Sequence, residues 1–434
     1  IGECEADLGA FTEGGVERSN LREWAYDYQR ETKIPAELVE EENLTKSHAM
    51  EAWKEARQKA DFETFCPHLE KLIDLNRRRT DLWGYEDHPY DALLTTYERG
   101  ARTETIKALF DAFKGEASGL VAEAEERSQG IDDRFLQGDF PIPAQMAFNR
   151  EVAEALGFDF EAGRIDTTTH PFCSGIAPGD TRLTTRYDPA NFTSSFFGVL
   201  HEAGHGLYEQ GLPTEAFGTP AGSSASLGIH ESQSRLWENH VGRSGEFWEH
   251  WMPRACHHFP SLKGVTAEAM TRAVNRAERS FVRVEADEAT YDLHIILRFE
   301  LEQQLISGDL APRDVPAAWE ALFIELFDIR VPDHARGCLQ DIHWSLSAFG
   351  YFPTYTLGNF NAAQLFAAAT APETGISDDL ASGNFQSLLE WLRVHVHRPG
   401  RQFLPAELLE KATGDSTRFE PHLGHLRRRY VEAM

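Results

Sequence analysis

The sequence predicts a mainly α-helical protein with one small β-hairpin or sheet, and three observations support this fold class. Apolar residues recur at three- and four-residue spacing along most of the chain, which is typical of amphipathic helices. Residues 163–190 differ, because they are rich in β-branched and polar residues with Pro and Gly between them. No internal repeat or low-complexity linker is visible, so residues 1–434 are expected to form a single domain.

The individual helices are predicted from apolar spacing and from Gly or Pro at their ends. Before residues 163–190, the predicted helices span residues 35–62, 64–79, 86–97, 101–128 and 144–156. After them, the predicted helices span residues 192–210, 229–241, 245–256, 267–275, 278–307, 314–328, 360–369, 378–396 and 405–413. The β-segment is expected to lie beside the helix over residues 192–210.

The acidic composition excludes some classes of partner. The chain carries 70 Asp and Glu against 42 Lys and Arg, a formal net charge of −28. Nucleic acid and anionic membranes bind basic surfaces, so neither is expected as a partner. No apolar run approaches the roughly 20 residues that a membrane span needs. Arg outnumbers Lys, and an acidic, Lys-poor surface fits either a protein adapted to high salt or an ordinary acidic enzyme of the cytosol.

The cysteines indicate the redox environment. They are Cys4, Cys66, Cys173, Cys256 and Cys338, an odd and scattered set without a CxxC pair. We predict reduced thiols rather than a disulfide framework or a metal cluster. The start of the chain shows no secretory signal pattern, so a cytoplasmic location is expected.

The segment HEAGH at 201–205 carries the clearest chemical signal. It lies in the helix predicted over residues 192–210, which Gly211 ends. Residues four apart lie on one face of an α-helix, so His201 and His205 can bind a single Zn²⁺. Glu202, next to the first histidine, can then reach a water molecule on that metal.

A catalytic zinc site needs a third protein ligand and leaves a fourth position for water. Glu231, near the start of the helix predicted over residues 229–241, is the candidate. From spacing alone, Glu231 could equally stabilise the N-terminus of its own helix. The two histidines could likewise be buried, hydrogen-bonded residues without a metal. In a catalytic site, Glu202 acts as general base, because zinc lowers the pKa of water to about 7.

Several other segments combine charged and apolar residues in a way that a simple core does not favour. They are HPF at 170–172, DTRLT at 180–184, VRVEAD at 282–287, GCLQDIHW at 337–344 and GYFPTYTLGNFNAAQLF at 350–366. Together with HEAGHGLYEQ at 201–210 and HESQSRLWEN at 230–239, they resemble the Taq-type (thermostable) zinc metallocarboxypeptidase family. The motifs occur in order from about His170 to Leu357 and beyond, and the resemblance implies that Glu231 is the third ligand.

The resemblance also implies a fold and an activity that composition and spacing do not show. Members are similar in fold to neurolysin and angiotensin-converting enzyme, almost entirely helical with a deep groove over the metal. They remove single residues from peptide C-termini with broad preference, usually as homodimers, and Co²⁺ often substitutes for Zn²⁺. We therefore expect a metallopeptidase domain with an N-terminal helical wall (1–135) and a catalytic core (136–434), acting on peptides with a free C-terminus.

A carboxypeptidase must recognise a free α-carboxylate, and Arg does this best because it can bind bidentately. Arg283 in VRVEAD is the first candidate for this role, and Arg182 in DTRLT is the second. Either arginine could instead form a structural ion pair, Arg283 with Asp287 and Arg182 with Asp180.

An oxyanion forms at the attacked carbon, and hydrogen-bond donors aimed at it lower the barrier. The spacing of His343 and Tyr355 resembles that of the His and Tyr donors in neurolysin-like enzymes, and Tyr351 is a further candidate for contact with the substrate. These residues could instead only pack the floor of the groove. Asp180 and Asp341 are candidates for orienting a ligand or an arginine.

Two other functions compete with the carboxypeptidase. An oligopeptidase would cut internally through the same zinc site, and it would not need a carboxylate-binding Arg283. A non-catalytic helical scaffold could keep a structural metal, but such a site needs no base like Glu202. Family members usually carry further residues before the start of this chain, and without those helices we expect a more open groove and a less strict exopeptidase.

Overall fold

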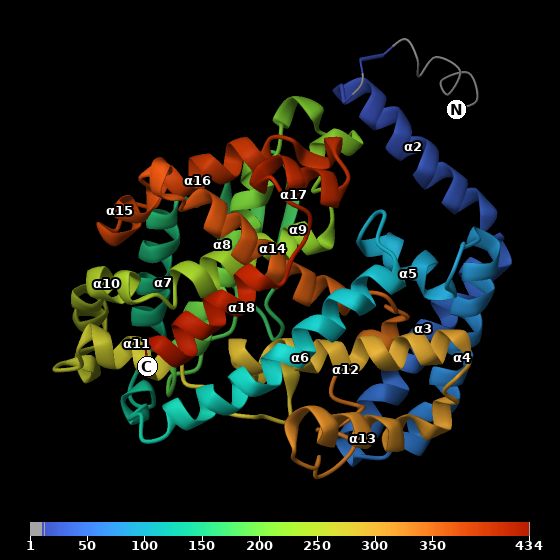
Figure 1. Ribbon diagram of the computed structural model, residues 1–434, viewed down its shortest axis with the longest axis horizontal. Coiled ribbons are helices and arrows are strands. Elements are labelled where there is room, and N and C mark those ends of the chain that lie inside the picture. The colour runs from blue at the N-terminus through green and yellow to red at the C-terminus, as the bar shows by residue number, and fades with distance from the viewer. Residues whose placement is uncertain (1–10, 13, 434) are drawn as a thin grey trace. The chain divides into compact units, whose positions relative to one another are not determined.

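The computed structural model describes residues 11, 12 and 14–433, which are predominantly helical (Figure 1). The described residues form two compact units, each built from segments distant in sequence. The first combines residues 22–125 and 277–356, and the second combines 126–276, 357–433 and the described residues up to Leu21. This partition differs from the predicted wall of 1–135 and core of 136–434, and the single domain stays a prediction. None of the described helices is long and apolar enough to span a membrane.

The first unit is helical throughout its regular structure. Its helices are the later part of α2 (Val16–Lys33), α3 (Ala36–Lys59), α4 (Phe62–Trp83), α5 (Pro89–Tyr97), α6 (Thr103–Ser128), α12 (Glu288–Ser307) and α13 (Val315–Phe327), with 3₁₀ turns η7 (Arg283–Glu285), η8 (Pro312–Asp314) and η9 (His343–Leu346). Figure 1 shows α3 and α4 side by side, and the two helices pack against each other. α12 is buried on most of its faces, as expected of a helix that other helices surround.

The second unit combines helices with the β-segment. Before its sheet and around the HEAGH segment, its elements are η2 (Arg134–Leu136), α7 (Ile142–Leu156), α8 (Phe192–Gly211), η3 (Thr214–Ala216), η4 (Pro220–Gly222), α9 (Leu227–Arg235), the π-helix η5 (Leu236–Val241), α10 (Gly245–His258), η6 (Pro260–Leu262) and α11 (Ala267–Val274). Its later elements are α14 (Pro353–Ala369), which begins in the first unit, η10 (Pro372–Thr374), α15 (Ile376–Ala381), α16 (Gln386–Leu392), the π-helix η11 (Arg393–His397), η12 (Gly400–Gln402), α17 (Pro405–Thr413), α18 (Glu420–Arg427) and the π-helix η13 (Arg428–Glu432). One continuous apolar core joins α7, α8, α10, α14 and α16.

The β-segment is a mixed three-stranded sheet rather than a simple hairpin. Strands β1 (Gly163–Thr167), β2 (Cys173–Ala177) and β3 (Asp180–Thr185) lie in the order β1-β3-β2. β2 and β3 form the antiparallel hairpin, and β1 adds to β3 in parallel. Both β2 and β3 pack on α8, with Leu183 fully buried. The prediction of a small sheet beside the helix of the HEAGH segment is therefore confirmed.

Most predicted helices are present, but two are interrupted. The helix predicted over 278–307 begins only at Glu288, because the side chain of Asp287 accepts a hydrogen bond from the N–H of Thr290 and caps α12. The helix predicted over 378–396 is divided into α15 and α16. Gly383 lies between them with φ of 79°, a left-handed conformation that a helix does not contain.

Helices α2 and α18 were not predicted from the sequence. α2 is rich in charged residues and has few apolar positions, so it is a polar helix overall. α18 is short and runs directly into the π-helix η13, which breaks the periodicity of 3.6 residues. The four cysteines within the described residues carry free thiols, as predicted, and Cys4 lies outside those residues.

Candidate metal centre and active site

α8 brings the two histidines of the HEAGH segment onto one face. The helix begins after Asn191, whose side chain accepts a hydrogen bond from the N–H of Thr193 at 2.9 Å, and it ends at Gly211 as predicted. The rings of His201 and His205 lie one turn apart, with centroids separated by 4.9 Å. Both side chains can therefore bind the same ion beside α8.

α9 brings Glu231 to the same point. The helix begins after Ser226, whose hydroxyl accepts a hydrogen bond from the N–H of Ile229 at 3.0 Å. Oε2 of Glu231 lies 3.7 Å from Nε2 of His201 and 3.4 Å from Nε2 of His205. One ligand atom from each of the three residues lies within 4.8 Å of the others, so the structure assembles the donor set predicted from the sequence.

Two glycines allow this close approach. A Cβ added to Gly204, in the middle of the HEAGH segment, would lie 2.5 Å from the backbone oxygen of Gln233 in α9. A Cβ added to Gly358 of α14 would lie 2.6 Å from Cγ of Glu231. The absence of side chains at both positions lets α8, α9 and α14 pack closely enough to bring the Glu231 carboxylate to the histidines.

The Glu231 carboxylate is ionised, and its two oxygens contact different groups. Oε1 accepts a hydrogen bond from Nε of Arg235 at 2.7 Å, and Oε2 faces the histidines and accepts one from Ser234 at 3.1 Å. Burial acts to raise the pKa of Glu231, but Arg235 and His201 outweigh it and hold that pKa well below its ordinary value. A buried, negatively charged oxygen that faces two imidazoles is a favourable environment for a divalent cation.

The π-helix η5 supplies a carboxylate behind His201. Oε2 of Glu238 lies 3.0 Å from Nδ1 of His201, so Nε2 is the nitrogen left for a metal. Arg235 and Arg243 lie near the same carboxylate, at 3.6 and 3.2 Å. Burial acts to raise the pKa of Glu238, but the hydrogen bond with His201 and these two arginines lower it to about 2. π-helical turns are frequent at functional sites, and Glu238, which contacts His201, lies in this one.

Glu202 is a buried carboxyl group beside these ligands. Its pKa is raised to about 7, mainly because burial disfavours the charged form, and Glu231 and Glu238 add to the shift. A carboxyl group with a pKa near neutrality can accept and release a proton at ordinary pH, which a general base requires.

The donor set fits a zinc ion. Two imidazole nitrogens and one carboxylate oxygen are the ligands of many catalytic zinc sites, which keep a fourth position for water. Burial lowers the pKa of His205 to about 3, so this imidazole is neutral, as a metal ligand must be.

The first unit contains a second cluster of predicted site residues, centred on Asp341. Nε and Nη2 of Arg283 donate to Oδ1 of Asp341 at 3.0 and 2.8 Å, and Nη1 donates to the hydroxyl of Tyr291 at 2.7 Å. Nε of Arg298 donates to Oδ2 at 2.7 Å. Burial acts to raise the pKa of Asp341, but the two guanidinium groups hold it well below its ordinary value. Two buried arginines thus share one carboxylate.

The predicted oxyanion donors belong to the same cluster. Nε2 of His343 lies 3.2 Å from the hydroxyl of Tyr355, and the guanidinium of Arg283 lies 5.0 Å from the centre of the Tyr355 ring. Burial lowers the pKa of His343 to about 4, so its imidazole is neutral. The ring of Tyr351 lies 5.3 Å from both His343 and Tyr355. The structure therefore brings together the four predicted residues of this unit.

The two alternative ion pairs predicted from the sequence have different outcomes. Arg182, on β3 of the second unit, is exposed and forms a bidentate pair with Asp180, with both contacts at 2.8 Å. The pair of Arg283 with Asp287 is wrong, because Arg283 binds Asp341 and Asp287 caps α12 through Thr290. The expectation that Asp180 and Asp341 orient an arginine is met by these contacts.

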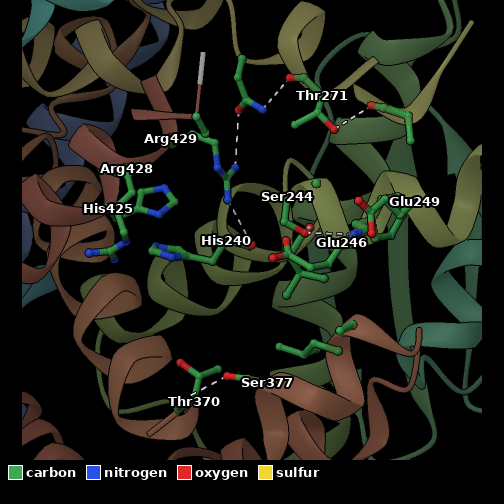
Figure 2. A pocket seen from close by; sticks show the side chains of 18 of the residues that line it. His240, Ser244, Glu246, Glu249, Thr271, Thr370, Ser377, His425, Arg428 and Arg429 are labelled. Carbon is green, nitrogen blue, oxygen red and sulfur yellow. Dashed lines mark hydrogen bonds between the residues drawn. The ribbon is translucent and has the colours of Figure 1, made fainter. Parts of the chain in front are cut away.

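The second unit also contains a cavity of about 560 Å³ between α10, α11, α15 and the C-terminal helices (Figure 2). Its lining carries both signs of charge, with Glu246 and Glu249 from α10 and Arg428 and Arg429 from η13. Nη1 of Arg429 is bound to the backbone oxygen of Asn239 at 2.8 Å. No predicted ligand or substrate-binding residue lines this cavity, so it is distinct from the metal centre.

Some residues of the site were not identified from the sequence. Glu238 lies two turns after Glu231, so a search for carboxylates on one helix face would have found it. Gly204 stands inside the motif, and its lack of a side chain is a signal of close packing. Arg298 has no sequence signal, because its partner Asp341 is 43 residues away in another motif.

Comparisons with known proteins identify the family of this chain. The model of the family described as Carboxypeptidase Taq (M32) metallopeptidase matches residues 3–430. Thermostable carboxypeptidase 1 of Thermus thermophilus is 43% identical over 421 residues, which cover 95% of this chain and 82% of that protein. Carboxypeptidase 1 of Bacillus subtilis is 37% identical over 425 residues, covering 98% and 84%.

Solved structures give the same result. The M32 carboxypeptidase of Deinococcus radiodurans matches with a TM-score of 0.93 and 39% identity, over 96% of this chain and 84% of that one. Metallocarboxypeptidase 1 of Trypanosoma cruzi matches with a TM-score of 0.93 and 34% identity, over 99% and 86%. The chain therefore belongs to the Carboxypeptidase Taq (M32) metallopeptidase family and is a metallocarboxypeptidase.

Proposed function

We propose that this metallocarboxypeptidase uses one zinc ion, held by His201, His205 and Glu231, to remove single residues from peptide C-termini with broad preference. The convergence of Nε2 of both histidines on Oε2 of Glu231 carries this proposal. When bound, zinc supplies a Lewis acid that lowers the pKa of water to about 7 and polarises a carbonyl group.

Glu202 is the proposed general base. Its carboxylate takes a proton from the attacking water and delivers it to the amide nitrogen of the departing residue. The raised pKa of about 7 suits both steps, because the group can be ionised before the attack and protonated after it.

Arg283 is the proposed binding group for the free α-carboxylate. Its cluster contains two arginines and one aspartate, so Asp341 does not neutralise both cations. An added carboxylate would balance the remaining charge, and the planar guanidinium can bind it bidentately. Arg182 is the second candidate, but it is exposed and Asp180 pairs with it one to one, so that pair carries no excess positive charge.

His343 and Tyr355 are the proposed hydrogen-bond donors to the oxyanion, with Tyr351 as a substrate contact. A neutral imidazole and a phenol can each donate one hydrogen bond without bringing a full charge. The contact between Nε2 of His343 and the Tyr355 hydroxyl supports their acting together.

Further properties belong to the proposal. Co²⁺ replaces Zn²⁺, because the two imidazoles and one carboxylate suit either metal. The chain acts as a homodimer in the cytoplasm on peptides with a free C-terminus, and its excess of acidic residues keeps nucleic acid and anionic membranes from binding. Light scattering coupled to size exclusion measures the oligomeric state directly.

Mass spectrometry of a peptide mixture tests the proposed activity. The metal-loaded protein should produce ladders that lose one C-terminal residue at a time, and Glu202→Gln should produce none while still binding zinc. Internal cuts would instead identify an oligopeptidase that uses the same residues. No cleavage by folded, zinc-bound protein at any salt concentration would overturn the proposal.

A further inference from the structure

His205 is supported on its outer side by another histidine, which is itself supported by a carboxylate. Nδ1 of His205 lies 2.6 Å from Nδ1 of His230, and Nε2 of His230 lies 2.7 Å from Oε1 of Glu209. All three side chains are largely buried, with exposed fractions of 16%, 15% and 21%. His201 has a simpler support, because Glu238 contacts its Nδ1 directly.

The hydrogen positions in this chain of three groups follow from one another. If Nε2 of His205 binds a metal, the ring must carry its proton on Nδ1. That proton is donated to Nδ1 of His230, which must then be unprotonated. The proton of His230 is therefore on Nε2, where it is donated to Glu209. The reverse arrangement, in which His230 donates from Nδ1, would place the His205 proton on Nε2 and block the metal.

Gly175 in β2 is a second observation about Glu209, because it leaves space for the Glu209 carboxylate. Glu209 Oε2 lies where a Cβ of residue 175 would be, so only Gly175 leaves room for this carboxylate. Gly175 has no left-handed φ, so its backbone does not require glycine. Space for the Glu209 carboxylate is thus a physical reason for glycine at this position of the strand.

We propose that Glu209 and His230 are positioning residues for the metal, fixing the tautomer and the ring plane of His205. This inference rests on the proposed zinc site. Groups that hydrogen-bond to the outer nitrogen of a ligand histidine commonly change metal affinity by about 10- to 100-fold when they are removed. Here two residues, His230 and Glu209, lie in line behind His205, and Gly175 of β2 leaves the space that Glu209 occupies.

Zinc affinity of four variants, measured by competition with a chromophoric chelator, tests the proposal. Glu209→Leu and Gly175→Ala should weaken zinc binding by about 10- to 100-fold. Gly175→Ala does so without altering any ligand, because its methyl group displaces only the flexible end of Glu209. Glu209→Gln should keep most of the affinity, since its amide oxygen can still accept the proton of His230. Ile176→Ala, an exposed neighbour on the same strand, is the matched control and should bind zinc as the parent does.

Two more measurements separate positioning from folding. The visible absorption spectrum of the Co²⁺-loaded protein reports ligand geometry, and it should change in Glu209→Leu and Gly175→Ala but not in Glu209→Gln. The melting temperature of the metal-free protein should be similar in all variants. Parent-like zinc affinity and cobalt spectrum in both Glu209→Leu and Gly175→Ala would overturn the inference. A parent protein that binds no zinc would instead overturn the proposed function.

Discussion

Asp341 binds Arg298 with 2.6 Å between Oδ2 and Nη2, and this arginine has no exposed surface. The other oxygen of Asp341 binds Arg283, so one carboxylate holds two buried cations. Asp341→Asn would leave both guanidinium groups without a counter-charge, which costs about 3–5 kcal/mol for a buried pair. We expect a loss of that size in the free energy of unfolding measured with urea. The exposed pair of Asp111 with Lys107 provides the control, and Asp111→Asn should cost at most about 1 kcal/mol. Equal losses in the two variants would contradict the prediction.

Arg283→Met should change substrate preference. Its removal leaves Asp341 paired with Arg298, so the remaining charges balance. The parent enzyme should prefer a peptide with a free C-terminus over its amidated form, and Arg283→Met should lose about 10²-fold or more of that preference in kcat/KM. Arg182→Met, which alters only the exposed pair with Asp180, is the comparison. If Arg182→Met loses the preference and Arg283→Met keeps it, the two assignments are reversed.

Gly204→Ala and Gly119→Ala should have opposite effects although both lie inside helices, Gly204 in α8 and Gly119 in α6. Alanine is favoured over glycine in a helix by about 1 kcal/mol. At Gly119 no atom lies within 4 Å of an added Cβ, so Gly119→Ala should be neutral or stabilising. At Gly204 the Cβ would meet the backbone of α9, so overpacking should destabilise the protein by about 1–3 kcal/mol and weaken zinc binding. Melting temperatures and chelator competition measure both effects, and a stabilised Gly204→Ala would contradict the close contact.

Glu302 should make the protein less stable as the pH rises from about 4.3 to 7. Burial raises the pKa of Glu302 to about 7, although Tyr90 and Trp344 donate hydrogen bonds to it. Because the unfolded chain loses this proton near pH 4.3, the folded state holds more protons across that range and stability falls, by at most about 4 kcal/mol.

The slope of melting temperature against pH tests this effect. Glu302→Gln cannot titrate, so its slope between pH 5 and 7 should be shallower than that of the parent protein. The two proteins are compared by the slope of melting temperature against pH and not by the melting temperature itself. The amide of Glu302→Gln has an N–H group that the carboxylate lacks, and this difference changes the melting temperature at every pH. Parallel curves would show that Glu302 does not titrate in this range.

Removal of the metal should abolish peptide hydrolysis and lower the melting temperature. A ligand that binds only the folded state stabilises it by about 2.7 kcal/mol at a concentration of 100 Kd. The melting temperature should therefore rise with free Zn²⁺ and with free Co²⁺. His205→Ala lacks one ligand, and its melting temperature should not respond to zinc at the same concentrations. A response in His205→Ala equal to that of the parent would place the metal elsewhere.

Glu231 as third candidate ligand followed from the resemblance to the family. The helical fold class, the small sheet beside α8 and the other two candidate ligands, His201 and His205, follow from the sequence alone. These features depend on local patterns, because apolar spacing and the four-residue separation of His201 and His205 act within one helix. The order of the motifs also indicated the family, which the comparisons confirm.

Which groups support those residues depends on contacts in the folded structure. These contacts join different turns, helices or loops: Glu238 with His201, His230 and Glu209 with His205, and Asp341 with Arg283. The parallel addition of β1 and the shared carboxylate of the two arginines likewise depend on contacts between distant segments. Such contacts form only when the whole unit packs. A glycine that lets a neighbouring backbone approach is then as important as the charged residue that this approach brings into contact.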